Sequence, residues 1–261
     1  MLQTVINSDN RKFCLYITIK CKGTKTFRCA AGDSKPYSKY ADRTITVNGE
    51  RTIYFSFPIS PLALRFVVCN VADKNDKDFE VEIQERPLKD YAVWLDDKTM
   101  NFLKLGLYFS QVSGFEAADP KGRKFSTSDN EFTIRYYPVI RDVQSGRPMS
   151  TPARIGHNSG IIDASKAKFD KMTVAMRVCI LLHEYSHKYR NPEMDLPIED
   201  EVGADINGLY IYLGLGFSKV DAIYVYANVF LKAQTPGNID RMRKIMEYIK
   251  RFENQEIASL N

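Results

Sequence analysis

The pattern of apolar residues changes near residue 88, and this change constrains the fold more than any other feature of the sequence. Before it, short runs of β-branched and aromatic residues alternate with turn-forming residues, which is typical of β-strands. After it, and above all from residue 165 onward, apolar residues recur at helical spacing. We therefore expect an α+β protein. A β-rich domain at residues 1–88, a sandwich or barrel, would precede a mainly helical domain at residues 89–261 with a small edge-stranded sheet.

The N-terminal region contains several predicted strands, at residues 13–19, 44–47, 52–57, 64–71 and 79–84. Asn48-Gly49 follows the second of them and is a strong hairpin-turn signal, because both residue types tolerate positive φ angles. The last run alternates apolar and polar residues, so we expect one of its faces to be exposed to solvent.

The middle of the chain combines a helix with short strands. Residues 97–113 carry apolar positions at helical spacing, whereas residues 131–140 are typical of a strand in which Pro138 favours an edge position. The stretch 145–160 is rich in Ser, Gly, Pro and Asn, which predicts a loop flanking a short strand near residues 153–155.

The C-terminal part is predicted to be helical. Its first helix is expected to begin at Asp163 or Ser165, to run through Lys188 and to be largely buried, since residues 174–182 are apolar on nearly every face. Further helices are expected from about 198 to 213, from Ser218 and after residues 236–238.

Charge is only mildly unbalanced. The formal net charge is +5 and the pI is about 8.8, and acidic residues interrupt the basic ones, as in residues 73–78. A nucleic-acid-binding protein more often has a basic stripe, so this class is disfavoured, while an acidic partner remains compatible with the charge.

The cysteines and the apolar runs indicate the compartment. The chain has five cysteines, an odd number, and no C-x-x-C pair, which argues against a disulfide framework and favours a reducing compartment. The N-terminus lacks the features of a signal peptide, and the apolar runs fall short of the ~18 residues that a membrane span needs. We expect a soluble cytoplasmic protein, or one within a phage particle or host cytoplasm if its origin is viral.

The motif with the clearest chemistry is His183-Glu184-Tyr185-Ser186-His187. In a helix, residues four apart lie on one face, so the two imidazoles can bind one ion, for which zinc is well suited. Glu184 lies about a quarter-turn away, where its carboxylate can reach a water molecule on that ion.

A third protein ligand is needed to complete a catalytic zinc site. Candidates follow Pro197 in the segment Glu199-Asp200-Glu201-Val202-Gly203-Ala204-Asp205. Glu201 and Asp205 are four apart and share a helix face, and Glu199 and Asp200 are rival ligands.

H-E-x-x-H followed by E-x-x-A-D on the next helix resembles the gluzincin metallopeptidases, and among them the prenyl-processing and stress-associated membrane proteases. The resemblance covers about residues 165–210. It implies that His183, His187 and Glu201 bind Zn²⁺, that Glu184 is the general base of peptide hydrolysis, and that Asp205 accepts a hydrogen bond from a zinc-bound histidine.

Other features of that family are reduced or absent. Thr235-Pro236 and Arg241 weakly match its Thr-His-Pro and Arg-Ile motifs, but the histidine expected to assist the transition state is missing, as are the membrane helices. The resemblance thus implies a soluble, minimal relative that acts on a protein or peptide. Residues 153–155 and 160–163 resemble the edge strand that lies beside the substrate in minimal zincins.

Two other functions stay open. The chain could be a structural or assembly protein, for example a virion component, that retains a zincin fold and joins a larger assembly through its N-terminal domain. Sequence-nonspecific nucleic-acid binding is the weaker alternative. Among further candidates, His157 could touch substrate or be solvated, Cys179 is expected to be buried, and tyrosines that could stabilise an oxyanion are Tyr210, Tyr212, Tyr224 and Tyr226.

Overall fold

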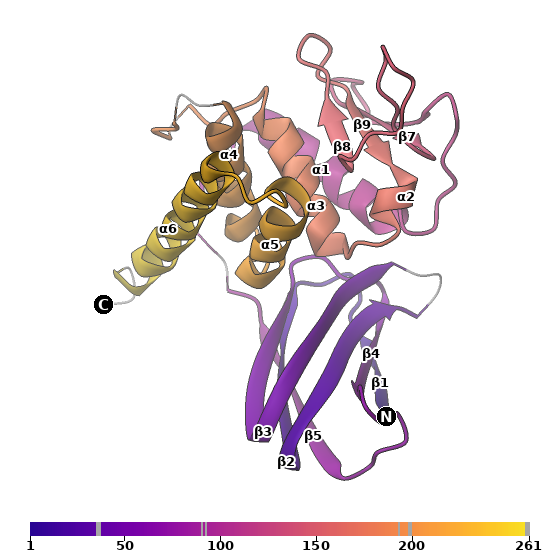
Figure 1. Ribbon diagram of the computed structural model, residues 1–261, viewed down its shortest axis with the longest axis vertical. Coiled ribbons are helices and arrows are strands. Elements are labelled where there is room, and N and C mark those ends of the chain that lie inside the picture. Colours follow the sequence, from indigo (N-terminus) through magenta and orange to yellow (C-terminus); the bar gives the residue numbers. More distant parts are fainter. Residues whose placement is uncertain (35–37, 90, 92, 193, 198–199, 259–261) are drawn as a thin grey trace. The chain divides into compact units, whose positions relative to one another are not determined.

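The computed structural model describes residues 1–34, 38–89, 91, 93–192, 194–197 and 200–258 (Figure 1). Strands fill the N-terminal region and helices dominate the C-terminal half, as predicted. The chain divides into two compact units. The β unit comprises Met1–Tyr91 with Thr173–Ala175 and Leu215–Ser218, and the helical unit comprises Ala92–Met172, Met176–Gly214 and Lys219–Asn261.

The β unit is one antiparallel sheet of five strands: β1 (Leu2–Asn7), β2 (Phe13–Asp33), β3 (Lys39–Phe57), β4 (Ala63–Asn70) and β5 (Phe79–Pro87). The long β2 lies at its centre. It pairs with β3 along one side, and with β5 and then β4 in succession along the other, while β1 pairs with β4. The finer expectation of a sandwich or barrel stays a prediction.

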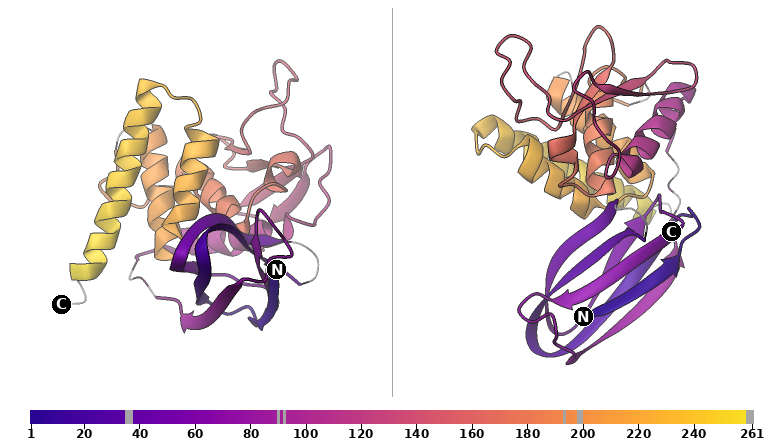
Figure 2. Two further views of the ribbon diagram at one scale, coloured as in Figure 1. Left: turned by 60° about the horizontal axis from the view of Figure 1, so that its bottom comes forward. Right: turned by 90° about the vertical axis from the view of Figure 1, so that its right-hand side faces the viewer.

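The predicted hairpin at Asn48-Gly49 is wrong, because both residues lie inside the continuous strand β3. The register between β2 and β3 shifts at this point, and Gly49 (φ 74°) and Gly23 (φ 69°) take up the irregularity. At this point the positive φ angles accommodate a β-bulge between two long strands, and the chain does not reverse its direction. Figure 2 shows β2 and β3 side by side and curved along their length.

Alternation along the strands builds the core of the β unit. Side chains on one face of β2 are fully buried, whereas β5 alternates between half-buried and exposed positions, as predicted for a strand with a wet face. The core includes Leu15, Ile17, Ile19, Phe27, Phe55, Phe57, Phe66 and Val68.

The helical unit is built from α1 (Asp97–Val112), β6 (Arg123–Ser126), β7 (Thr133–Tyr137), β8 (Ala153–Ile155), β9 (Ile162–Ser165), α2 (Lys166–Phe169), α3 (Val174–Ser186), α4 (Asp200–Gly214), α5 (Lys219–Val225), the π-helical turn η1 (Tyr226–Phe230) and α6 (Pro236–Ala258). Its small sheet has the order β6-β7-β9-β8, with β7 and β9 parallel. Within the described residues, every helix is too short or too polar to cross a membrane.

Two predictions about this sheet need correction. β7 is paired on both sides, and Pro138 follows its last residue, so proline ends the strand and does not mark an edge. The edge strands are β6 and β8, whereas residues 162–165 form β9 between β7 and β8. Of the two segments expected beside a substrate, only residues 153–155 therefore lie at the edge.

The helix predicted from Asp163 or Ser165 through Lys188 is divided in the structure. Residues 162–165 pair on both sides as β9, and α2 has only four residues before α3 begins at Val174. Arg177, which is 1% exposed, donates from Nε to the carbonyl oxygen of Phe169 (3.0 Å). Sheet pairing and this buried contact override the helical periodicity of the sequence.

Candidate metal centre

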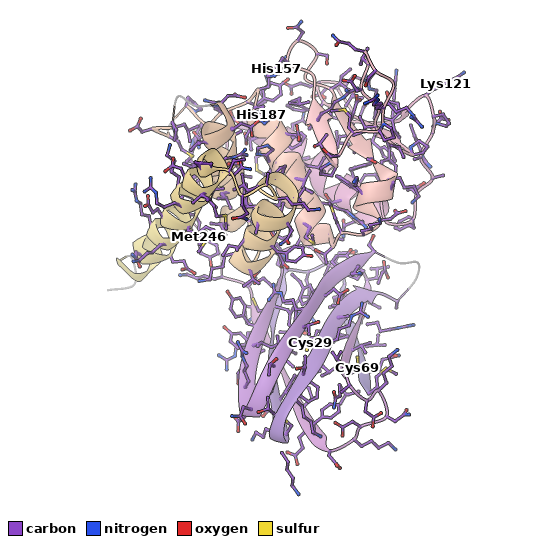
Figure 3. The ribbon with its side chains drawn as sticks, in the orientation of Figure 1. Cys29, Cys69, Lys121, His157, His187 and Met246 are labelled. Atoms are coloured by element: carbon purple, nitrogen blue, oxygen red, sulfur yellow. The ribbon has the colours of Figure 1, made fainter. Side chains whose placement is uncertain are left out.

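His183 lies in α3 and His187 in the turn that directly follows its last residue, and the two rings face one another. Their Nε2 atoms lie 3.1 Å apart and their ring planes are nearly perpendicular, at 82°. His183 is 3% exposed, and 10% of the His187 side chain is exposed. Figure 3 labels His187 at the helices of this site.

The neighbouring helix α4 supplies a carboxylate. α3 and α4 lie side by side (Figure 1), and at Gly208 they are so close that an added Cβ would lie 3.1 Å from the backbone nitrogen of His183. The Glu201 carboxylate oxygens lie 3.8 Å from His183 Nε2 and 3.8 Å from His187 Nε2. One donor atom from each of the three residues lies within 4.8 Å of the others, so the group is positioned to hold a metal ion.

Acidic residues of α4 contact the outer nitrogens of both rings. His183 Nδ1 lies 2.9 Å from Asp205 Oδ1, although the carboxylate is off the direction of a straight N–H hydrogen bond. His187 Nδ1 lies 2.7 Å from Asp200 Oδ2. A carboxylate beside each Nδ1 favours the tautomer with the proton on that nitrogen, which leaves the Nε2 lone pair for a ligand.

This arrangement needs a positive charge between the rings. Two Nε2 lone pairs at 3.1 Å repel one another, and the Glu201 carboxylate adds negative charge. Burial lowers the pKa of His183, but Asp205, Glu184 and Glu201 outweigh burial and raise that pKa. Either an added proton or a metal cation can therefore satisfy the site.

Arg241 of α6 fixes the acidic side chains. Its Nη2 lies 2.8 Å from Glu201 Oε2 and 2.8 Å from Asp205 Oδ1, and its Nε donates to Asp205 Oδ2. Asp205 is fully buried, so this ion pair compensates a charge that would otherwise be costly. Arg241 has only a weak motif match in the sequence, and its contact with Asp205 spans 36 positions.

Glu184 lies beside the metal-ligating group but is not part of it. It is 6% exposed, and its Oε2 accepts a hydrogen bond from the backbone nitrogen of Ile155 in β8 (3.0 Å). Burial raises the pKa of Glu184, and His183, His187 and the Ile155 N–H oppose this only in part. The pKa of this carboxyl group therefore lies above its usual value, because burial disfavours the charged form.

A cleft of about 610 Å³ opens over these side chains. It is lined by Ser150, Thr151, Pro152, Ala153, Arg154, Lys168, Met172, His183, Glu184, His187, Glu201, Asn228, Val229, Phe230, Lys232 and Arg241. The ring of Phe230 packs on that of His183, with centroids 4.2 Å apart. Edge strand β8 contributes Ala153 and Arg154 to the wall, so the metal-ligating residues face a space beside a strand edge that pairs with no further described strand.

The other sequence candidates lie elsewhere. Asp200 contacts the outer nitrogen of His187 and is not in the metal-ligating group, whereas Glu199 falls outside the described residues. His157 is exposed on the loop after β8 (Figure 3), and Cys179 is buried as expected. None of the described residues that line the cleft is a tyrosine.

The donor set fits a divalent transition metal. Zinc–nitrogen bonds of about 2.0–2.1 Å in a tetrahedron place donor atoms about 3.3 Å apart. The observed separations of 3.1 and 3.8 Å are close to that value. Imidazole and carboxylate donors also suit several other first-row metals.

No protein-family model, curated protein or solved structure matches this chain.

Proposed function

We propose that the protein is a zinc-dependent endopeptidase of the gluzincin type. The observation that carries this proposal is the convergence of His183, His187 and Glu201 next to a buried carboxylate, Glu184, in an open cleft. A metal-ligating group without an adjacent carboxylate would support metal storage or a structural role equally well.

His183, His187 and Glu201 would hold the ion. When bound, zinc supplies Lewis acidity, which polarises a carbonyl and lowers the pKa of water toward about 7. Asp205 and Asp200 hold the proton on Nδ1 of each ring, and Arg241 restrains the Glu201 and Asp205 carboxylates. Such supporting contacts fix the ring orientation before any ligand arrives.

Glu184 would move the proton. Its Oε2 is held by the Ile155 N–H, so the carboxylate has a defined orientation at the cleft. The general base accepts a proton from the attacking water and delivers it to the nitrogen of the leaving amine. Its pKa, raised by burial, suits both halves of this transfer.

The β8 edge would align the substrate. An extended peptide can add to β8, which pairs with no further described strand, through backbone groups other than the Ile155 N–H that Glu184 already binds. Such backbone hydrogen bonds bind many sequences in one geometry. This mode supports an endopeptidase, because it does not require a chain terminus at the cleft.

The proposal is tested by metal removal. The full-length protein, loaded with Zn²⁺, is incubated with a mixture of internally quenched peptides, and cleavage is followed by fluorescence and mass spectrometry. We expect a chelator to abolish cleavage and Zn²⁺, but not Mg²⁺, to restore it, because Mg²⁺ prefers oxygen ligands. Cleavage that persists after complete metal removal would refute the zinc mechanism.

A second candidate is an assembly protein with a metal-binding but inactive zincin domain. It is favoured by the cleft lining, in which the described residues include no histidine beyond the two ligands and no tyrosine. Stabilisation of the transition state would then have to come from other groups. A zinc-loaded protein that cleaves no peptide in the mixture would favour this role.

A further inference from the structure

The charges that line the cleft are unevenly distributed. Four cationic side chains, Arg154, Lys168, Lys232 and Arg241, face the same space as only two acidic ones, Glu184 and Glu201. Glu201 belongs to the metal-ligating group, and Glu184 accepts a hydrogen bond from the Ile155 N–H. A bound divalent cation would make the cleft more positive still.

The four cations differ in how far they are neutralised. Arg241 pairs with Asp205 and Glu201, and the guanidinium of Arg154 lies 3.2 Å from Asp163. Lys168 of α2 and Lys232, which follows η1, both line the cleft, and neither forms an ion pair with another described residue. The ammonium groups of Lys168 and Lys232 are therefore the cations of this cleft that can pair with an anionic ligand.

We infer that the cleft selects acidic peptide segments, with Lys168 and Lys232 as specificity-determining residues that contact aspartate or glutamate side chains near the scissile bond. This inference rests on the proposed endopeptidase function and adds its substrate class. Like-signed charges in a concave site attract an oppositely charged chain and disfavour a basic one.

A peptide fits these features better than a nucleic acid, the other common polyanion. Strand β8 offers a backbone edge that an extended peptide can pair with. Nucleic-acid grooves generally add aromatic side chains on which bases stack. Phe230 is the one phenylalanine, tyrosine or tryptophan among the described lining residues, and its ring is already packed on that of His183.

The test compares three peptides that differ at positions flanking one cleavage site and carry glutamate, glutamine or lysine there. The ratio of kcat/KM for the glutamate peptide to that for the lysine peptide is measured in full-length, zinc-loaded protein. The variant Lys168→Glu/Lys232→Glu is compared with Lys104→Glu/Lys250→Glu. Lys104 of α1 and Lys250 of α6 are exposed and do not line the cleft, so the control carries the same change in net charge.

We expect the glutamate peptide to be preferred about tenfold, because each partly exposed ion pair contributes a factor of a few. The preference should fall with added salt, invert in Lys168→Glu/Lys232→Glu and persist in the control pair. Equal cleavage of the three peptides, or a preference changed equally by both double variants, would overturn the inference while leaving the endopeptidase function intact.

A binding measurement keeps the two proposals separable if no peptide is cleaved. Zinc-loaded Glu184→Gln protein is titrated with fluorescent versions of the same peptides and with a single-stranded oligonucleotide. Tighter binding of the glutamate peptide, lost in the Lys168/Lys232 variant, would support the acidic selection without catalysis. Binding of the oligonucleotide but of none of the peptides would overturn it.

Discussion

Replacing Glu184 by glutamine is expected to leave the zinc content unchanged and to lower kcat/KM for peptide hydrolysis by roughly 10²- to 10⁴-fold. Glutamine keeps the size of the side chain and can accept the Ile155 N–H, but it cannot take a proton from water. The folded protein should be at least as stable as the wild type, because the substitution removes a carboxylate whose burial raises its pKa. Metal analysis, peptide kinetics and chemical denaturation measure the three effects.

Glu247→Gln is the matched control, since Glu247 is an exposed residue of α6 that does not line the cleft. Its activity should match that of the wild type. Full activity of zinc-loaded Glu184→Gln would remove Glu184 from the mechanism. Loss of zinc in that variant would instead indicate that Glu184 helps to hold the metal.

The second large effect is expected at Asp205. Asp205→Ala removes the partner of His183 Nδ1 and leaves the Arg241 guanidinium with only Glu201. Breaking a buried pair from one side costs about 3–5 kcal/mol of folding free energy, and the lost histidine contact weakens metal affinity about 10–100-fold. Denaturant titration and competition with a zinc-binding dye measure these two losses separately.

A double variant separates the two roles of Asp205. Asp205→Ala/Arg241→Met no longer carries the guanidinium that lost its buried partner, so part of the lost stability should return while zinc affinity stays low. Asp240→Ala, at an exposed position of α6, is the control and should change neither quantity appreciably. Unchanged zinc affinity in Asp205→Ala would show that His183 does not need this partner.

The metal-ligating histidines could be predicted from the sequence because their geometry is local. Residues four apart on a helix share a face, and the turn that directly follows α3 keeps His187 opposite His183. The Glu201 to Asp205 spacing within α4 follows the same rule. Arg241 and the Ile155 N–H could not be predicted in this way. They reach the site across 36 and 29 positions, so their placement depends on how α6 and β8 pack.

The N-terminal strands also show that local sequence patterns cannot predict long-range pairing. Alternating residues correctly predicted strands in this region, but Asn48-Gly49 has the same local preference in a hairpin turn and in a bulge. The pairing of β2 with β3 decides between them, and no short window of sequence contains both strands. Likewise, Asp163 and Ser165 are residue types that favour a helix start, but both lie in β9, which pairs with strands on either side.

The most direct measurement of the central claim is the zinc content per chain of the purified protein and of two histidine variants. His183→Ala removes a proposed ligand, and His157→Ala removes an exposed histidine outside the metal-ligating group. We predict about one zinc ion in the wild type and in His157→Ala, and almost none in folded His183→Ala. Equal zinc content in all three proteins, or none in the wild type after exposure to Zn²⁺, would contradict the convergence of two imidazoles and a carboxylate on one metal ion.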